Sequence, residues 1–392
     1  MSELNYLEKL LDGVEVEWIR LGNLVRIKNG KDHKSLGEGD FPVYGSGGVM
    51  RYADTYAYDK PSVLIPRKGS LGNLFFVDVP FWTVDTIFYT IIDETKIWPK
   101  YLYYFLTTVG LGNMNQAGGV PSQTQSVLNE LKIPIPCPNN PEKSLAIQSE
   151  IVRILDKFTA LTAELTAELT ARKKQYNYYR DKLLSFEEGE VEWKTLDEVA
   201  SFRRGSFPQP YGNSEWYNGE GCMPFVQVAD VADFGFRLHR STKQQISKLA
   251  QSKSVFVEAG TVIVSLQGTI GRVALTQYDC YVDRTLAIFT KYKAAVNKKY
   301  FAHQLKAKFD LEKEFARGST LKTITKEEFS KFQIPIPPLE VQNRIVALLD
   351  KFDRLTHSIE EGLPRELELR QKQYEYYREL LFSFPKLEAA SN

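Results

Sequence analysis

The sequence predicts an α+β protein in which two α/β domains are separated by two long antiparallel coiled-coil helices. Three observations support this fold class: a repeat of whole segments, long stretches with coiled-coil spacing, and short apolar runs between turns elsewhere. We assign residues 1–141 to the first domain and 142–189 to a central helix. Residues 190–338 form the second domain and 339–392 a C-terminal helix. The expected arrangement is cyclic, with a pseudo-twofold axis relating the halves.

The repeat is the strongest signal in the chain. QSEIVRILDKFTALT (148–162) returns as QNRIVALLDKFDRLT (342–356), and RKKQYNYYRDKLLSF (172–186) returns as RQKQYEYYRELLFSF (370–384). Self-similarity on this scale marks a duplicated structural unit. The N-terminal LEKLLDGVEVEW also resembles the end of the first repeated helix, YRDKLLSFEEGEVEW. The chain thus begins where a repeat unit ends, so we expect its two ends to meet.

The segment from Pro141 to Phe186 is predicted to be one long helix. Its large side chains are spaced by threes, fours and one seven, as in a coiled-coil seam, and good helix formers dominate it. The second copy keeps this spacing, but Gly362-Leu363-Pro364 should kink or break the helix. The tyrosines on these helices lie at seam spacing, so packing or subunit docking is favoured over base stacking.

The remaining parts of the two halves share a frame but not a sequence. KGSLGN (68–73) resembles QGTIGR (267–272), and VDTIFYT (84–90) resembles VDRTLAIF (282–289). FPVYGSGGVMRYADTYAYD, in contrast, has no visible counterpart in the second half. Short apolar runs alternate with turn residues in both inserts, which indicates compact α/β domains. The two IPIP segments are expected to be extended exits that lead into the helices.

Composition sets broad limits on function. The net charge is only +1, but phosphate binding depends on local patches rather than on the total charge. Two such patches are residues 60–77 and 237–257, which contain basic residues and no acidic ones. The three cysteines have no metal-ligand spacing and indicate a reducing compartment. No signal peptide and no run of about 18 apolar residues is present. We therefore expect a cytoplasmic, soluble protein without membrane association.

The sequence favours recognition over chemistry. It lacks a Walker A motif, a GxGxxG fingerprint, HExxH and the NPP[FY] tetrapeptide of amino-methyltransferases. Gly45-Ser46-Gly47-Gly48 invites interpretation as a nucleophile turn, but a glycine-rich turn that lets backbone approach a ligand is favoured. We therefore predict no catalytic residue and no metal ligand.

The repeated blocks resemble the specificity subunits of type I restriction-modification systems. The similarity rests on the IPIP exits, the QxxIVxxLDKF block and the RxKQYxYYRxxLLSF block. The tandem TAEL units at 162–165 and 166–169 resemble the hallmark of the type IC subclass.

This resemblance implies a role in host defence and DNA methylation. Each insert would be a target-recognition domain that binds one half of a bipartite, asymmetric site in double-stranded DNA. The helices would space the domains and dock two modification subunits, which use S-adenosylmethionine to methylate adenine. Restriction subunits, which use ATP and Mg²⁺ for translocation and cleavage, would join them. The chain itself would bind no cofactor.

Base edges are read mainly by Arg, Lys, Asn and Gln, while phosphate contacts set the register. In the first domain we select the loops that hold Tyr44, Ser46, Arg51, Tyr52, Arg67, Lys68, Ser70 and Asn73. In the second we select Arg203, Arg204, Gln227, Arg237, Arg240, Lys243, Gln267, Thr269, Arg272 and Lys322. For each of these the alternative is a solvated surface charge or a turn residue.

Two other functions are left open by the residues. One is a single-chain DNA methyltransferase or nuclease, against which the missing motifs argue. The other is a coiled-coil adaptor without a DNA role, against which the divergence of the inserts argues.

Overall fold

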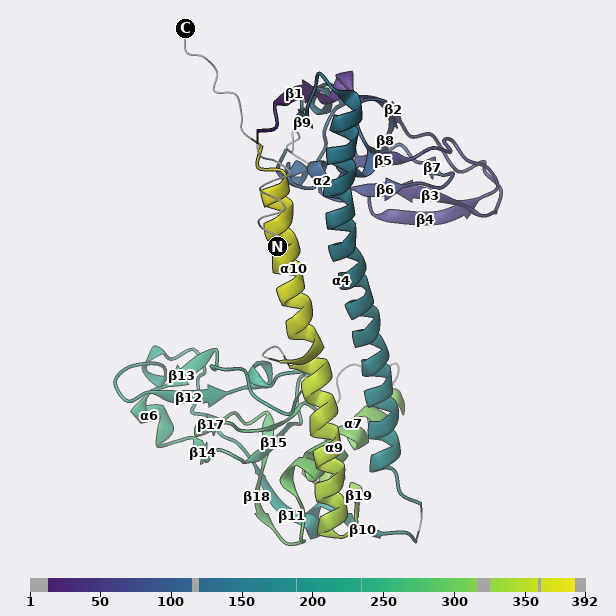
Figure 1. Ribbon diagram of the computed structural model, residues 1–392. Coiled ribbons are helices and arrows are strands. Elements are labelled where there is room, and N and C mark those ends of the chain that lie inside the picture. Colours follow the sequence, from purple (N-terminus) through teal and green to yellow (C-terminus); the bar gives the residue numbers. More distant parts are fainter. Residues whose placement is uncertain are drawn as a thin grey trace. The chain divides into compact units, whose positions relative to one another are not determined.

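A computed structural model describes residues 13–114, 120–187, 189–233, 235–315, 325–358 and 361–384. The chain divides into two compact units. The first comprises Met1–Glu164 and Glu368–Asn392, and the second comprises Leu165–Leu367. Each unit contains one sheet domain and parts of the long helices (Figure 1).

The first unit contains two sheets and a two-stranded ribbon. The larger sheet has the antiparallel order β2 (Val25–Asn29), β8 (Ile87–Ile92), β5 (Ser62–Pro66), β6 (Phe75–Val77). The smaller has the order β4 (Gly48–Ala53), β3 (Phe41–Gly45), β7 (Trp82–Thr83), with β3 and β7 parallel. The ribbon pairs β1 (Val16–Arg20) with β9 (Lys132–Pro136). The short helices are η1 (Leu21–Asn23), α2 (Pro99–Leu106), η2 (Leu111–Asn113) and α3 (Gln125–Asn129).

The second unit repeats this strand order, with one additional strand at the edge of its smaller sheet. Its larger sheet has the order β11 (Ala200–Arg204), β18 (Leu286–Tyr292), β15 (Val262–Ser265), β16 (Val273–Leu275). Its smaller sheet has the order β13 (Gln244–Ile246), β12 (Met223–Val226), β17 (Cys280–Val282), β14 (Val255–Val257), with β12 and β17 parallel. The ribbon pairs β10 (Glu192–Thr195) with β19 (Gln333–Ile336). The helices are α5 (Leu196–Val199), η3 (Ser214–Trp216), η4 (Val228–Asp230), α6 (Lys248–Gln251), α7 (Lys298–Phe315) and α8 (Lys326–Ser330).

The matching topologies extend the repeat beyond what the sequence indicates. FPVYG in β3 occupies the place of MPFV in β12. Each pairs in parallel with the short strand, β7 or β17, that directly precedes the second strand of the larger sheet. The two inserts have therefore diverged in sequence within one strand order. The weaker echoes are confirmed, since KGSLGN and QGTIGR both connect the third and fourth strands of the larger sheets.

The predicted long helix is confirmed as α4 (Pro141–Leu184). The second copy is broken, as expected, into α9 (Leu339–His357) and α10 (Gly362–Leu381). Gly362 has a φ of 78°, and a Cβ atom built there would lie 2.5 Å from the carbonyl oxygen of Arg354. Only glycine fits this backbone, because side chains disfavour a positive φ and the neighbouring carbonyl fills the space.

Aromatic side chains pair the long helices within each unit. In the first unit Phe158 of α4 stacks on Tyr377 of α10, with ring centroids 5.2 Å apart. In the second, Tyr176 contacts His357 at 5.5 Å and Tyr179 contacts Phe352 at 6.0 Å. Along α4 the contacts run from Tyr176 to Tyr179, while their partners on α9 run back from His357 to Phe352. The two segments are therefore antiparallel. Packing is thus confirmed for Tyr176, Tyr179 and Tyr377, whereas Tyr178 and Tyr376 are more exposed.

The two ends of the described chain share one hydrophobic core in the first unit. Phe382, just after α10, packs against Tyr101 and Phe105 with ring centroids 5.3 and 5.5 Å apart. Trp18 on β1 contacts Phe105 in turn, at 6.2 Å. The expected meeting of the two ends is therefore confirmed. No helix within the described ranges is long and apolar enough to cross a membrane.

The IPIP segments are extended, as predicted, but they are strands of the ribbons rather than free exits. Tyr101 donates its hydroxyl hydrogen to the carbonyl of Pro134 at 2.8 Å, and Tyr300 donates to Pro335 at 3.0 Å. Proline has no backbone N–H to donate, and it is tolerated in these two-stranded ribbons because each strand has one side without a partner strand. The ribbons thereby fix the start of each long helix to its own domain.

Candidate nucleic-acid interface

Two of the predicted segments in the first domain lie side by side. Asn73 donates from Nδ2 to the carbonyl oxygen of Ser46 at 3.3 Å. A Cβ atom on Gly69 would lie 3.3 Å from Ser46 Oγ. The turn between β3 and β4 and the loop between β5 and β6 therefore form one surface. Its exposed side chains include those of Lys68, Ser70 and Asn73, whereas the exposed Tyr52 lies at the other end of the hairpin, opposite Pro42.

Other predicted residues shape this surface from behind. The half-buried ring of Tyr44 packs 5.8 Å from Phe75, and burial raises the pKa of Tyr44. The guanidinium of Arg51 donates to the carbonyls of Leu36 and Gly37, each at 3.1 Å. Because its donors are used internally, Arg51 holds a neighbouring turn in place.

A third segment, residues 121–125, completes the surface of the first domain. Gln123 is buried, and its Nε2 donates to the carbonyl of Pro66 at 2.6 Å while its backbone N–H donates to Arg67. Lys68 forms a bridge with Ser122. The guanidinium of Arg67 lies 5.9 Å from the ring centroid of Phe88. Gln123 was missed by the sequence analysis, because nothing in its local sequence marks it as a buried positioning residue.

In the second domain Asp230 organises the connection between β12 and β13. This aspartate is 1% exposed. Its two carboxylate oxygens accept hydrogen bonds from the backbone N–H groups of Gln227 and Lys243, each at 2.8 Å. Its carbonyl accepts from His239 at 2.9 Å. Asp230 therefore closes residues 227–243 into a loop. No sequence signal distinguishes it from other acids.

The loop 227–243 is fastened to the hairpin loop of the larger sheet. Arg272 forms an ion pair with Asp233 at 2.7 Å and donates to the carbonyl of Val231 at 3.0 Å. Ser265 donates to the carbonyl of Thr269 at 2.6 Å, which sets the turn that also holds Gln267. The structure thus brings these two predicted segments together, with Arg272 as the link.

The remaining basic candidates differ in exposure. Arg203, Arg240 and Lys243 are exposed, whereas Arg204 and Arg237 are half-buried. Lys322 lies outside the described residues.

The same three contacts attach each domain to its long helix. Gln148 and Gln342 are both 0% exposed. Gln148 accepts from the backbone of Trp98 at 2.8 Å, and Gln342 accepts from the backbone of Asn297 at 2.8 Å. Each also donates to a carbonyl two residues earlier, that of Lys96 or Ala295. Ion pairs accompany them, Lys100–Asp156 at 2.9 Å and Lys299–Asp350 at 2.7 Å.

These contacts explain the repeated motif. The glutamine of QxxIV and the aspartate of LDK recur because each fixes the first turn of α2 or α7 to the long helix. Because of these contacts, each domain is held in a fixed position relative to the start of its own long helix.

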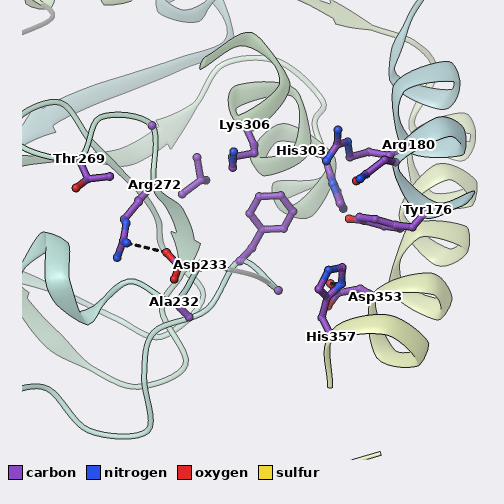
Figure 2. A pocket seen from close by; sticks show the side chains of 15 residues that line it. Tyr176, Arg180, Ala232, Asp233, Thr269, Arg272, His303, Lys306, Asp353 and His357 are labelled. Carbon is purple, nitrogen blue, oxygen red and sulfur yellow. Dashed lines mark ion pairs between the residues drawn. The ribbon is translucent and has the colours of Figure 1, made fainter. Parts of the chain in front are cut away.

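The second unit also has a polar cavity of about 250 Å³, which the helices α4, α7 and α9 line together with residues of the two loops that Arg272 links (Figure 2). Burial lowers the pKa of His303 to about 3, and its Nδ1 atom has no hydrogen-bond partner. Its counterpart in the first unit is Tyr104, whose hydroxyl donates to Asp156 at 2.6 Å. Metal binding has no support here, since the described part of the chain holds no cluster of three metal-ligating side chains.

The arrangement defines a class of protein with two recognition domains of one topology on a shared helical frame. The domains have like attachments and unlike outer surfaces, which suits the recognition of two different targets.

Comparison with known proteins specifies the family. The model for the type I restriction modification DNA specificity domain matches residues 13–172 and 188–369. The chain belongs to this family of specificity subunits, which recognise DNA and are not themselves catalysts. It is 42% identical to the EcoR124I/EcoR124II specificity subunit of Escherichia coli, over 100% of both chains. It is 34% identical to a putative type I specificity subunit of Haemophilus influenzae, over 97% of this chain and 98% of the other.

Solved structures support the fold. The S subunit of a type I system from M. genitalium aligns with a TM-score of 0.58 at 17% identity, covering 96% of this chain and 98% of the other. A chain from a study of complex assembly and conformational transition of the type I system also gives 0.58, at 18% identity, covering 95% and 98%.

Proposed function

We propose that this chain reads a bipartite, asymmetric DNA site, one half with each domain, as the specificity subunit of a type I complex. One observation carries the proposal: two domains share a strand order and the same helix attachments, but present different residues at their outer loops. A duplicated frame with unlike surfaces is expected when two unlike half-sites must be held at a set separation.

The repeated helices supply a reason for two modification subunits. Tyr178 and Tyr376 occupy equivalent places in the repeated QYxYY blocks and are 61% and 55% exposed. Large aromatic side chains exposed on a helix are suited to protein docking. Two equivalent docking sites fit two copies of one partner.

The partners would supply the chemistry. Modification subunits would bring S-adenosylmethionine and methylate adenine, and restriction subunits would bring ATP and Mg²⁺. The tandem TAEL units within α4 support assignment to the type IC subclass.

Methylation mapping of a random DNA library tests this function. The chain would be co-purified with its modification subunits, and the methylated adenines would be located by sequencing. We expect methylation only within one bipartite motif, and no methylation by either component alone. Methylation or cleavage by the purified chain alone would favour a single-chain enzyme, and a complex that fails to bind any DNA selectively would favour a structural adaptor.

A further inference from the structure

An apolar strip lies at the sheet edge of the first domain. Strand β4 is the outermost strand of its sheet, and Val49, Met50 and Tyr52 on it are 46%, 59% and 55% exposed. The charged residue between them, Arg51, turns its guanidinium onto backbone carbonyls. Exposed apolar edges are normally covered or charged because they promote association. This edge is therefore suited to a partner surface.

The position of the strip favours double-stranded DNA as that partner. The β3–β4 hairpin forms the outer edge of its sheet, since β7 pairs only with Val43 and Tyr44 of β3, and a pair of antiparallel strands can enter the major groove. At its turn a Cβ atom on Gly47 would meet nothing within 4 Å, so the tip is open. The exposed Lys68 and Asn73 flank this turn, and Asn73 is bonded to its backbone. This cationic and amide flank offers hydrogen-bond donors to phosphates and base edges, which favours DNA as the partner.

The second domain carries different chemistry at the same topological position. Its edge strand β13 exposes Gln244 and Gln245 in place of apolar side chains. The connection to this strand is the loop 227–243, which contains Arg237, Arg240 and Lys243, where the first domain has only Ser46-Gly47. One domain is thus built for apolar contact and the other for hydrogen bonds.

We propose that Val49 and Met50 read the 5-methyl groups of thymine in the first half-site. This inference rests on the proposed function and adds to it the chemistry by which one half-site is recognised. In the major groove the thymine methyl is the apolar feature that distinguishes A·T from the other pairs. Burial of one methyl against these side chains corresponds to about a fourfold gain in affinity.

Uracil substitution isolates this contact because it removes the methyl group and leaves base pairing intact. The complex of the chain with its modification subunits would be titrated with its mapped site, each thymine replaced in turn by uracil. We expect at least one thymine of one half-site to bind about fourfold more tightly than uracil. In the Val49→Ala/Met50→Ala variant, thymine and uracil at that position should bind equally. The matched control is Leu249→Ala, which removes an exposed apolar side chain from α6 of the second domain and should keep the discrimination.

Several outcomes would overturn the inference. They are equal binding of thymine and uracil by the unaltered complex, half-sites without A·T pairs, and discrimination that survives in the double variant. If the double variant keeps the discrimination but loses its modification subunits on co-purification, the strip docks protein instead. Failure of the proposed function is distinguishable, because then the unaltered complex would bind no bipartite site at all.

Discussion

At the scale of single residues, the repeated motif consists of buried polar groups that each satisfy defined partners. Gln148 and Gln342 each bond a backbone N–H and a backbone carbonyl at the start of α2 or α7. Buried polar groups are costly unless paired, so each glutamine is needed where it lies. The repeat is therefore a repeat of attachments, in addition to a repeat of apolar spacing.

Replacement of Gln148 by alanine should destabilise the first unit. The change leaves the N–H of Trp98 and the carbonyl of Lys96 buried without these partners, at a cost of about 2 kcal/mol or more. Urea unfolding would measure the loss. Gln371→Ala, which removes an exposed glutamine from α10, is the control and should change stability by less than about 0.5 kcal/mol. Equal effects of the two changes would contradict the attachment role.

His303 should make the second unit sensitive to mild acid. Burial lowers its pKa to about 3 in the folded state, while an unfolded histidine titrates near 6.5. Below pH 6.5 the unfolded chain therefore binds a proton that the folded chain does not, so stability present above pH 6.5 is lost as the pH falls. The loss should be about 1.4 kcal/mol per pH unit.

The difference between unaltered protein and His303→Phe isolates this effect from carboxylate titration. From pH 6.5 to 5.0 the unaltered protein should lose about 2 kcal/mol more than the variant in urea unfolding. His239→Gln, at an exposed position, should behave like the unaltered protein. Parallel pH profiles for all three would contradict the assignment.

At the scale of elements, the C-terminal helix completes the domain formed by the start of the chain. Phe382 lies against Tyr101 and Phe105, which belong to α2. The first unit therefore depends on an element encoded more than two hundred residues after its sheets. Helix α9 lies wholly within the second unit, and the division between the units falls inside α10, between Leu367 and Glu368.

Phe382→Ala should destabilise the first unit while leaving the second intact. Removal of a buried phenylalanine costs about 3–5 kcal/mol through lost burial and a cavity. Limited proteolysis should then cleave residues 20–110 before residues 200–300. Tyr376→Ala, at an exposed position on the same helix, should leave the cleavage order unchanged. Simultaneous cleavage of both units in Phe382→Ala would contradict separate packing.

At the scale of the whole molecule, the sequence predicted the frame well and the recognition surfaces incompletely. Helix bounds and the break followed from spacing and from Gly362, since both depend on local backbone chemistry. The shared topology of the inserts was not visible, because paired strands keep an alternation of burial that many sequences satisfy. Gly30 and Gly205 are one trace of the shared topology in the sequence, since each directly follows the first strand of a larger sheet. Glycine is required at both places because a Cβ atom there would collide with the carbonyl oxygen of Val84 or Val282.

In the candidate site, too, the features that depend on residue type were predicted from the sequence, and those that depend on long-range contacts were not. Loop positions such as Ser46 and Asn73 were found from residue type and prove to be adjacent. Arg51 and Arg272 also have suitable types, but their guanidinium groups bond within the fold. Which arginines point outward depends on long-range partners such as Asp233, and no local pattern encodes these. The pseudo-twofold placement of the two units stays a prediction.

The central claim is that α4 sets the separation of the two half-sites. Helix α4 runs without interruption through both TAEL units, and the division between the compact units falls at Glu164 and Leu165 within them. Four added residues lengthen a helix by about 6 Å and leave a net rotation of about 40°. One base-pair step of DNA turns by roughly 35°, so one added TAEL unit should correspond to one added base pair.

The most direct test inserts a third TAEL unit after Leu169 and measures binding of the complex to sites with graded spacers. We expect the longer helix to select the same two half-sites with an optimum spacer longer by one base pair. An unchanged optimum, or equal binding to all spacers, would contradict the claim that this helix is the ruler between two reading domains.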